Sequence, residues 1–169
     1  MNILETGGLS LRRLELSDAP FIVALLNDPA FIRFIADRGV RTEDDARNYL
    51  QAGPLASYAQ FGFGLFLVSL RIDGTSIGMC GLLKRPELED ADIGFAFLPA
   101  YRAKGYAYEI AAALLAVARG HFGLERVVAI VNHDNNASIR LLQRLGFAFE
   151  QKVAVPWHSE ELLRFGRAV

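Results

Sequence analysis

The chain has 169 residues, of which 52% are hydrophobic and 22% are charged, and its formal net charge is −1. This balance is typical of a globular protein with a sizeable core and argues against a disordered chain. The near-neutral charge also argues against nucleic acid or an anionic membrane as a partner. One cysteine, no secretion signal and no apolar run of roughly 20 residues lead us to expect a single cytoplasmic domain, residues 1–169, with no membrane contact.

The N-terminal third of the sequence predicts one strand followed by two helices. Leucines recurring at residues 9–14 indicate a short strand. Ser17 is expected to cap a first helix that runs to Leu26. Thr42 is expected to cap a second helix, which the Gly-Pro pair at 53–54 ends.

The remainder of the chain alternates between strand and helix patterns. In chain order it predicts a hairpin of strands 65–72 and 76–84 around Asp73-Gly74, a strand at 91–98, a helix at 106–122, a strand at 127–131, a helix at 138–145, and strands at 147–155 and 161–167. This order implies an α/β fold of the α+β type, in which a mixed central sheet carries helices on both faces.

The most informative turn is the segment Arg-Ala-Lys-Gly-Tyr-Ala at residues 102–107, between a predicted strand and a predicted helix. The free N–H groups at the start of a helix bind anions, and Gly105 allows the backbone to approach a bulky one. Arg102 and Lys104 add positive charge. The spacing fits neither a P-loop nor a dinucleotide fingerprint, so we expect a different phosphate-bearing cofactor; an ordinary strand-to-helix loop remains the alternative.

A second motif extends the first. Residues 132–147 follow the pattern Asn-x-x-Asn-x-x-Ser-x-x-Leu-x-x-x-x-Gly-Phe, and residues 27–29 read Asn-Asp-Pro after the first helix. Together with the turn, these segments resemble the GNAT N-acetyltransferases, in particular the branch of ribosomal-protein alanine N-acetyltransferases. The predicted order of elements also matches the fold of that family along nearly the whole chain.

The resemblance implies acetyl-CoA as the co-substrate and no metal ion. The pyrophosphate is expected on the turn at 102–107, and the pantetheine arm in a cleft where strand 91–98 splays from strand 127–131. The cofactor-binding residues implied in this way are Phe97, Leu98, Arg102, Ala103, Lys104, Gly105, Tyr106, Ala107, Asn132 and Asn135.

Two residues are candidates for catalysis. In the family, a carboxylate on the fourth strand serves as base, and Asp92 occupies that position, with Asp in place of the more usual Glu. The usual acid is a tyrosine, but here that position is Leu142, so Ser138 is the suggested substitute. The alternative readings are a polar residue near a strand end for Asp92, and a helix-start hydroxyl for Ser138.

The function implied is transfer of acetyl from acetyl-CoA to a primary amine by direct attack in a ternary complex. The acceptor is a small molecule or a protein N-terminus, and the protein is a monomer or a homodimer. Trp157 and His158 lie between the last two predicted strands, where an acceptor has room to sit. The alternative is a non-catalytic acyl-CoA-binding or regulatory module.

Overall fold

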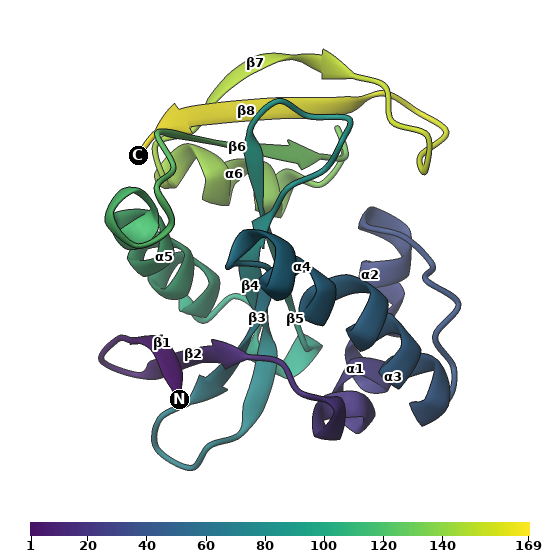
Figure 1. Cartoon of the computed structure of the whole chain (residues 1–169). Coiled ribbons are helices and arrows are strands. Elements are labelled where there is room, and N and C mark those ends of the chain that lie inside the picture. The colour runs from purple at the N-terminus through teal and green to yellow at the C-terminus, as the bar shows by residue number, and fades with distance from the viewer.

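The computed structural model describes residues 1–169, which form one eight-stranded sheet with its helices. The strands are β1 (Asn2–Glu5), β2 (Leu9–Arg13), β3 (Leu65–Leu70), β4 (Ser76–Leu83), β5 (Ala91–Phe97), β6 (Arg126–Val131), β7 (Ala148–Val153) and β8 (Leu162–Ala168). The helical elements are η1 (Leu16–Asp18), α1 (Ala19–Leu26), α2 (Pro29–Phe34), α3 (Glu43–Leu50), the π-helical turn η2 (Gln51–Leu55), α4 (Ala56–Phe61), η3 (Pro99–Tyr101), α5 (Tyr106–Phe122) and α6 (Asn136–Arg144) (Figure 1).

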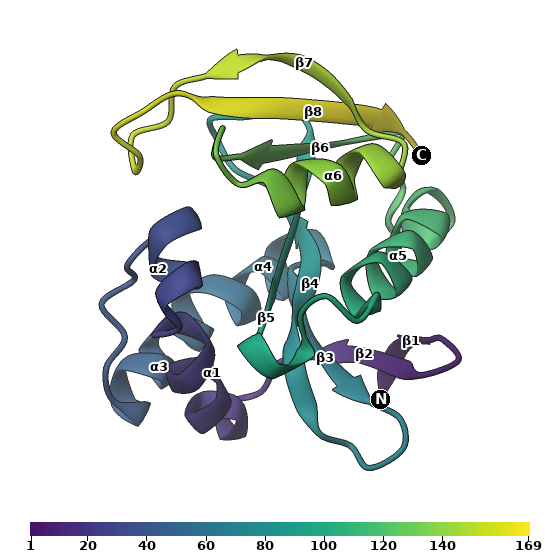
Figure 2. The ribbon, with the colours of Figure 1, turned by 180° about the vertical axis from the view of Figure 1, so that it is seen from behind.

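The sheet consists of two parts joined at one short parallel contact. Its strand order is β1-β2-β3-β4-β5-β6-β8-β7, and every pair is antiparallel except β5 with β6. In Figures 1 and 2, β3, β4 and β5 run down the view, whereas β6, β7 and β8 run across it. The parallel contact between β5 and β6 is therefore where the sheet changes direction.

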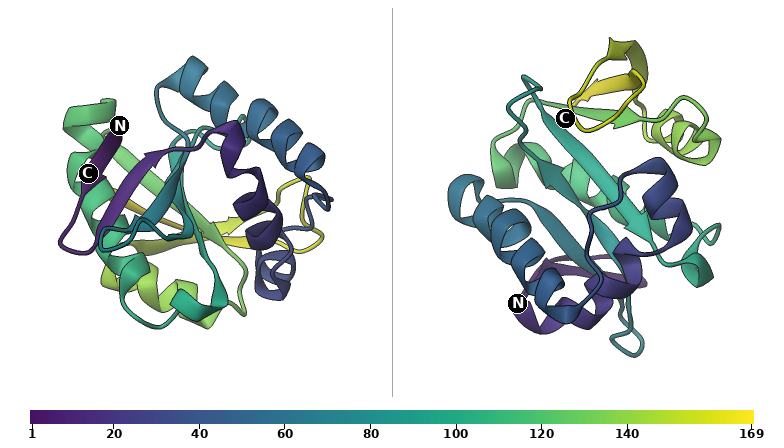
Figure 3. Two further views of the ribbon diagram at one scale, coloured as in Figure 1. Left: turned by 90° about the horizontal axis from the view of Figure 1, so that it is seen from below. Right: turned by 90° about the vertical axis from the view of Figure 1, so that its right-hand side faces the viewer.

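Helices cover both faces of the sheet, as expected from the order of elements (Figure 3). On one face, Ile110 and Leu114 of α5 and Leu142 of α6 belong to the larger apolar core. On the other face, Ile22 of α1 and Leu50 of α3 pack with the sheet in a second, smaller core. No helix is long and apolar enough to cross a membrane.

Most of the predicted elements are confirmed. The strand at 9–14, the hairpin at Asp73-Gly74, the helix at 106–122 and the last four elements are all present, with ends that differ from the prediction by at most two residues. Thr42 does cap α3, because its side chain accepts a hydrogen bond from the N–H of Asp45 at 3.1 Å. Leu142 of α6 and Leu145, which caps its C-terminal end, are both buried.

Two predicted boundaries are wrong. Ser17 is not a helix cap: it lies inside η1, where Glu15 and Asp18 form the capping box, and Asp18 occupies the N-cap position of α1. The second helix does not end at residues 53–54, because the π-helical turn η2 accommodates Pro54 and continues into α4. The sequence reading also missed β1, a four-residue edge strand, and α2, which begins at Pro29 directly after the end of α1.

Tyr58 connects α4 by hydrogen bonds to the end of β2 and the start of β3. Its hydroxyl accepts a hydrogen bond from the buried N–H of Leu14 at 3.0 Å and donates to the carbonyl of Leu65. The ring stacks on Phe66 with centroids 5.5 Å apart. Burial raises the pKa of Tyr58 to about 12, so the hydroxyl stays protonated and continues to donate.

We predict that Tyr58→Phe destabilises the protein by about 1–3 kcal/mol, because it leaves a buried N–H group and a buried carbonyl without their partner. Chemical denaturation measures the change. Tyr108→Phe is the matched control, since Tyr108 is exposed, and its stability should equal that of the wild type. Equal stabilities for the two variants would contradict the role given to the Tyr58 hydroxyl.

Candidate active site

β5 and β6 pair over a short stretch only and then separate. Their register consists of two pairs, Ala91 with Val127 and Asp92 with Val128. Beyond this point β5 remains paired with β4 alone. The N–H of Leu98 bonds to the carbonyl of Ile77 in β4. Because N–H groups alternate along a strand, those of Phe95 and Phe97 point away from β4, toward the side where β6 no longer pairs, and an amide-bearing chain can bind them there.

The turn at residues 102–107 has the geometry of an anion site. Gly105 is the N-cap residue of α5 with φ of 84°, and Ala103 also has a positive φ, 59°. The first helical hydrogen bond of α5 runs from the N–H of Glu109 to the carbonyl of Gly105. The preceding N–H groups, those of Tyr106, Ala107 and Tyr108, therefore have no hydrogen-bond partner. Free donors at the positive end of a 17-residue helix attract an anion.

Arg102, which was expected to bring positive charge to this turn, is paired within the protein. Its Nη2 is paired with the carboxylate of Asp28, and its Nε donates to the carbonyl of Phe97 at 3.0 Å. Asp28 is buried and also caps α2 by accepting from the N–H of Phe31. Arg102 thus ties the turn to the start of α2, and Lys104, which is exposed and forms no ion pair, is the unpaired cation of the turn.

Asp92 is the buried carboxylate of the site. It lies where β5 and β6 part, and only 1% of the residue is exposed. The Nε of Arg85 contacts both carboxylate oxygens, at 3.1 and 3.3 Å. Burial raises the pKa of Asp92 to about 6, although the charges of Arg85 and Lys84 oppose this rise. A carboxyl group with this pKa is ionised at neutral pH and takes up a proton more readily than an exposed aspartate.

Arg85 stacks on one aromatic residue and acts electrostatically on another. Its guanidinium lies over the ring of Trp157, with Cζ 4.8 Å from the ring centroid. Tyr49 of α3 is partly buried, and burial raises the pKa of its hydroxyl while the charges of Arg38 and Arg85 oppose the rise. Segments far apart in sequence therefore meet beside Asp92.

The start of α6 brings together the other candidates from the second motif. Asn135 is the N-cap residue, and its side-chain oxygen accepts from the N–H of Ser138 at 3.3 Å. The hydroxyl of Ser138 makes no hydrogen bond within the protein and is partly buried. Leu142, at the position of the usual acid, is 1% exposed and packs in the larger core.

Asn132, directly after β6, contacts His158 in the loop between β7 and β8. Its Oδ1 accepts from the N–H of Asp134, which fixes the amide orientation, and its Nδ2 lies 3.3 Å from Nε2 of His158. Nδ1 of His158 lies 2.9 Å from the carbonyl oxygen of Glu160 and 3.2 Å from its main-chain nitrogen. This arrangement keeps Trp157, one residue earlier, beside Arg85.

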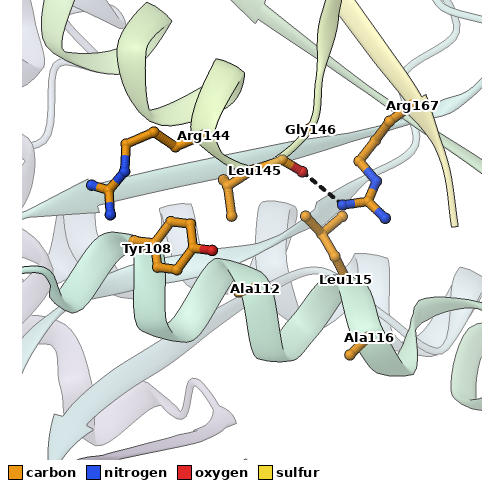
Figure 4. Close-up of a pocket in the computed structure, with 8 residues that line it drawn as sticks. All are labelled: Tyr108, Ala112, Leu115, Ala116, Arg144, Leu145, Gly146 and Arg167. Carbon is orange, nitrogen blue, oxygen red and sulfur yellow. Dashed lines mark hydrogen bonds between the residues drawn. The ribbon is translucent and has the colours of Figure 1, made fainter.

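A shallow groove lies between α5 and the C-terminal end of α6 (Figure 4). Its volume is about 320 Å³, at the small end of the range for ligand sites, so it suits one part of a larger ligand. Tyr108, in the first turn of α5, forms one end of the groove, and the guanidinium of Arg144 lies 4.6 Å from its ring centroid. The groove therefore begins beside the anion turn.

The structure thus gathers most of the residues predicted for the site around two features. The turn residues and Phe97 lie at the anion site and at the end of β5, while Asp92, Asn132 and the start of α6 lie near the splayed strands. Sequence reasoning missed Arg85 and Tyr49, because no motif marks them. Trp157 offered one signal, as the only tryptophan in the chain. No group of three or more His, Cys, Asp or Glu side chains is arranged to hold a metal ion.

The family follows from a comparison with known domains. Residues 9–148 match the model of the GNAT acetyltransferase domain. The chain therefore belongs to the GNAT acetyltransferase family, as its two motifs suggested.

Individual relatives agree with this assignment. The uncharacterised N-acetyltransferase YnaD of Bacillus subtilis (strain 168) is 28% identical over 147 residues, which cover 87% of this chain and 83% of YnaD. RimL, a ribosomal L7/L12 alpha-N-protein acetyltransferase solved with coenzyme A, superposes with a TM-score of 0.84 at 18% identity, over 100% of this chain and 98% of RimL. Spermidine N-acetyltransferase from Vibrio cholerae, solved with CoA and spermine, gives 0.79 at 18% identity, over 96% of each chain. The last two show the shared fold.

We predict that Gly105→Val weakens binding of CoA by roughly tenfold or more, which corresponds to about 1.4 kcal/mol. A Cβ at this position meets no atom within 4 Å, so the fold survives, but the side chain stands at the anion turn. The positive φ adds strain of about 1–2 kcal/mol. Isothermal titration calorimetry measures the affinity.

Gly123→Val provides the matched control for this experiment. Gly123 ends the same helix with φ of 70° and equally open surroundings, so the substitution introduces similar strain far from the anion turn. Its melting temperature should fall as in Gly105→Val, with CoA affinity unchanged. Equal affinities in both variants would place the pyrophosphate elsewhere.

Proposed function

We propose that the chain, as one catalytic domain, transfers the acetyl group of acetyl-CoA to a primary amine. The observation that carries this proposal is the position of a buried carboxylate, Asp92, where β5 and β6 stop pairing, on the strand that leads to an anion-binding helix start. Strand β5 supplies N–H donors for pantetheine amides, and the turn supplies donors and Lys104 for the pyrophosphate. Tyr108 and Arg144, beside the turn, then face the nucleotide part.

The proposed reaction is a direct attack on the thioester. The amine nitrogen forms a bond to the acetyl carbon, the carbon–sulfur bond breaks, and CoA leaves as a thiolate. A thiol with a pKa of about 8.5 is a good leaving group, so protonation of the sulfur contributes little to the rate. The proton lost by nitrogen passes to Asp92; the burial of this short side chain favours relay through water over direct contact.

A base is useful because amines are protonated at neutral pH. Keeping an amine neutral at pH 7 costs about 1.4 kcal/mol for a protein α-amine and about 4.6 kcal/mol for a lysine. Asp92 is ionised above its pKa of about 6 and can accept a proton in this range. The acceptor is a small-molecule amine or a protein N-terminus, the two kinds of acceptor named for the spermidine enzyme and for RimL.

We predict that Asp92→Asn lowers turnover about 100-fold or more at pH 7, within the usual range for loss of a general base. The wild-type rate should rise with pH through about 6, as Asp92 loses its proton, and the variant should lack this rise. The difference should shrink above pH 8, where the amine loses its proton unaided. Release of free thiol from acetyl-CoA, measured from pH 5 to 9 with a panel of amines, tests this.

Two further variants separate the base from the acid. Ser138→Ala should lower turnover only a few-fold and leave stability unchanged, because Asn135 caps the helix and the Ser138 hydroxyl makes no hydrogen bond. Leu142→Tyr should not raise activity, since the larger ring must enter a filled core and costs about 1–3 kcal/mol. A loss in Ser138→Ala that exceeds the loss in Asp92→Asn, at unchanged melting temperature, would make protonation of sulfur the dominant step.

The same panel decides between catalysis and binding alone. If CoA binds to the wild type and no amine releases thiol, the chain is the non-catalytic acyl-CoA-binding module and the proposed transfer is wrong.

A further inference from the structure

The terminal nitrogens of Arg85 have no partner. Its Nε is engaged with Asp92, but neither Nη1 nor Nη2 makes a hydrogen bond within the protein. The side chain is only 23% exposed, and its guanidinium is held against the face of Trp157. An arginine fixed at one end by a buried carboxylate, with its paired Nη groups free, is preorganised to bind a carboxylate in bidentate fashion.

The charge around Asp92 is predominantly positive. The charged groups that act on Asp92 are Arg85 and Lys84, and those that act on the neighbouring Tyr49 hydroxyl are Arg38 and Arg85. Lys84 is fixed in place, because its ammonium donates to the carbonyl of Leu88 at 2.7 Å. Arg85 and Lys84 place two cations beside one buried carboxylate, which disfavours an acceptor with several positive charges and favours one that carries a negative charge.

We infer that Arg85 is a specificity-determining residue that selects acceptors with a carboxylate a few bonds from the reacting amine, such as an amino acid or a peptide that begins with an acidic residue. This inference rests on the proposed function, because it assumes that the amine reacts beside Asp92. Arg85 contacts Asp92 directly, so a carboxylate bound by its Nη groups lies within a few bonds of an amine that gives its proton to Asp92. Polyamines are then poor acceptors.

Two matched pairs of acceptors test the inference. The first is Asp-Ala-Ala amide against Asn-Ala-Ala amide, which differ in one side-chain carboxylate. The second is alanine against alaninamide, with rates divided by the neutral fraction of each amine. A charge-assisted bidentate contact corresponds to a preference of about 10- to 100-fold in kcat/KM for the carboxylate member of at least one pair. Spermidine should be slower than either peptide.

The ratio of kcat/KM values within a pair of acceptors shows whether Arg85 recognises the acceptor carboxylate or only positions Asp92. In Arg85→Gln the preference should fall to about one, whereas Arg85→Lys should keep part of it because the charge remains. If Arg85 only positions Asp92, both members lose activity equally and the ratio stays unchanged. Arg47→Gln is the control: Arg47 lies on α3 about 200° around the helix from Tyr49 and pairs with Asp44, so the wild-type ratio should persist.

A binding measurement keeps the inference testable without turnover. Trp157 is the only tryptophan, and it packs on Arg85, so its fluorescence reports directly on this site. Titration of the CoA-loaded protein with Asp-Ala-Ala amide should change the emission with saturation in the wild type, and not in Arg85→Gln. The inference is overturned if neither pair of acceptors shows a preference, or if the preference is unchanged in Arg85→Gln. It is also overturned if the Asp- and Asn-peptides give equal fluorescence titrations. Turnover of uncharged amines alone leaves the transferase proposal intact and refutes this selectivity.

Discussion

The site depends on one interruption of hydrogen bonding, the point after Asp92 and Val128 where β5 and β6 stop pairing. A continuous sheet would satisfy the N–H groups of Phe95 and Phe97 and leave no room for a ligand. The interruption instead leaves main-chain donors of β5 without a partner strand. The larger core under α5 and α6 spans both parts of the sheet across this interruption, and the smaller core packs α1 and α3 on the other face.

The ion pair of Asp92 and Arg85 gives this site its chemical character. A carboxylate that is 1% exposed is costly to ionise, and raising its pKa to about 6 corresponds to about 3 kcal/mol relative to an exposed aspartate. Arg85 reduces that cost without removing it, because its Nε alone faces the carboxylate. The same contact leaves the Nη groups of Arg85 free beside Trp157. One ion pair therefore supports both the proposed base and the inferred selectivity for acceptors.

Local signals in the sequence predicted the elements well, and tertiary contacts account for most of what was missed. The capping box of Thr42 and Asp45, the Asp73-Gly74 turn and the ends of α5 depend on neighbouring residues, so they could be read directly. Proline usually ends a helix, but Pro54 is accommodated by a π-helical turn. At the site, Arg102 is paired with Asp28, 74 positions earlier, and Arg85 meets Trp157 from a distant loop. Nothing near these residues in the sequence indicates such partners.

The protonation of Asp92 tests the central claim most directly, because both the buried carboxylate and its role as base depend on it. Carbon-detected NMR of the protein with labelled aspartate, with the Asp92 signal assigned by its absence in Asp92→Asn, measures this titration. The account predicts a midpoint near pH 6 for Asp92. A midpoint near 4, the ordinary value for an exposed aspartate, would contradict it.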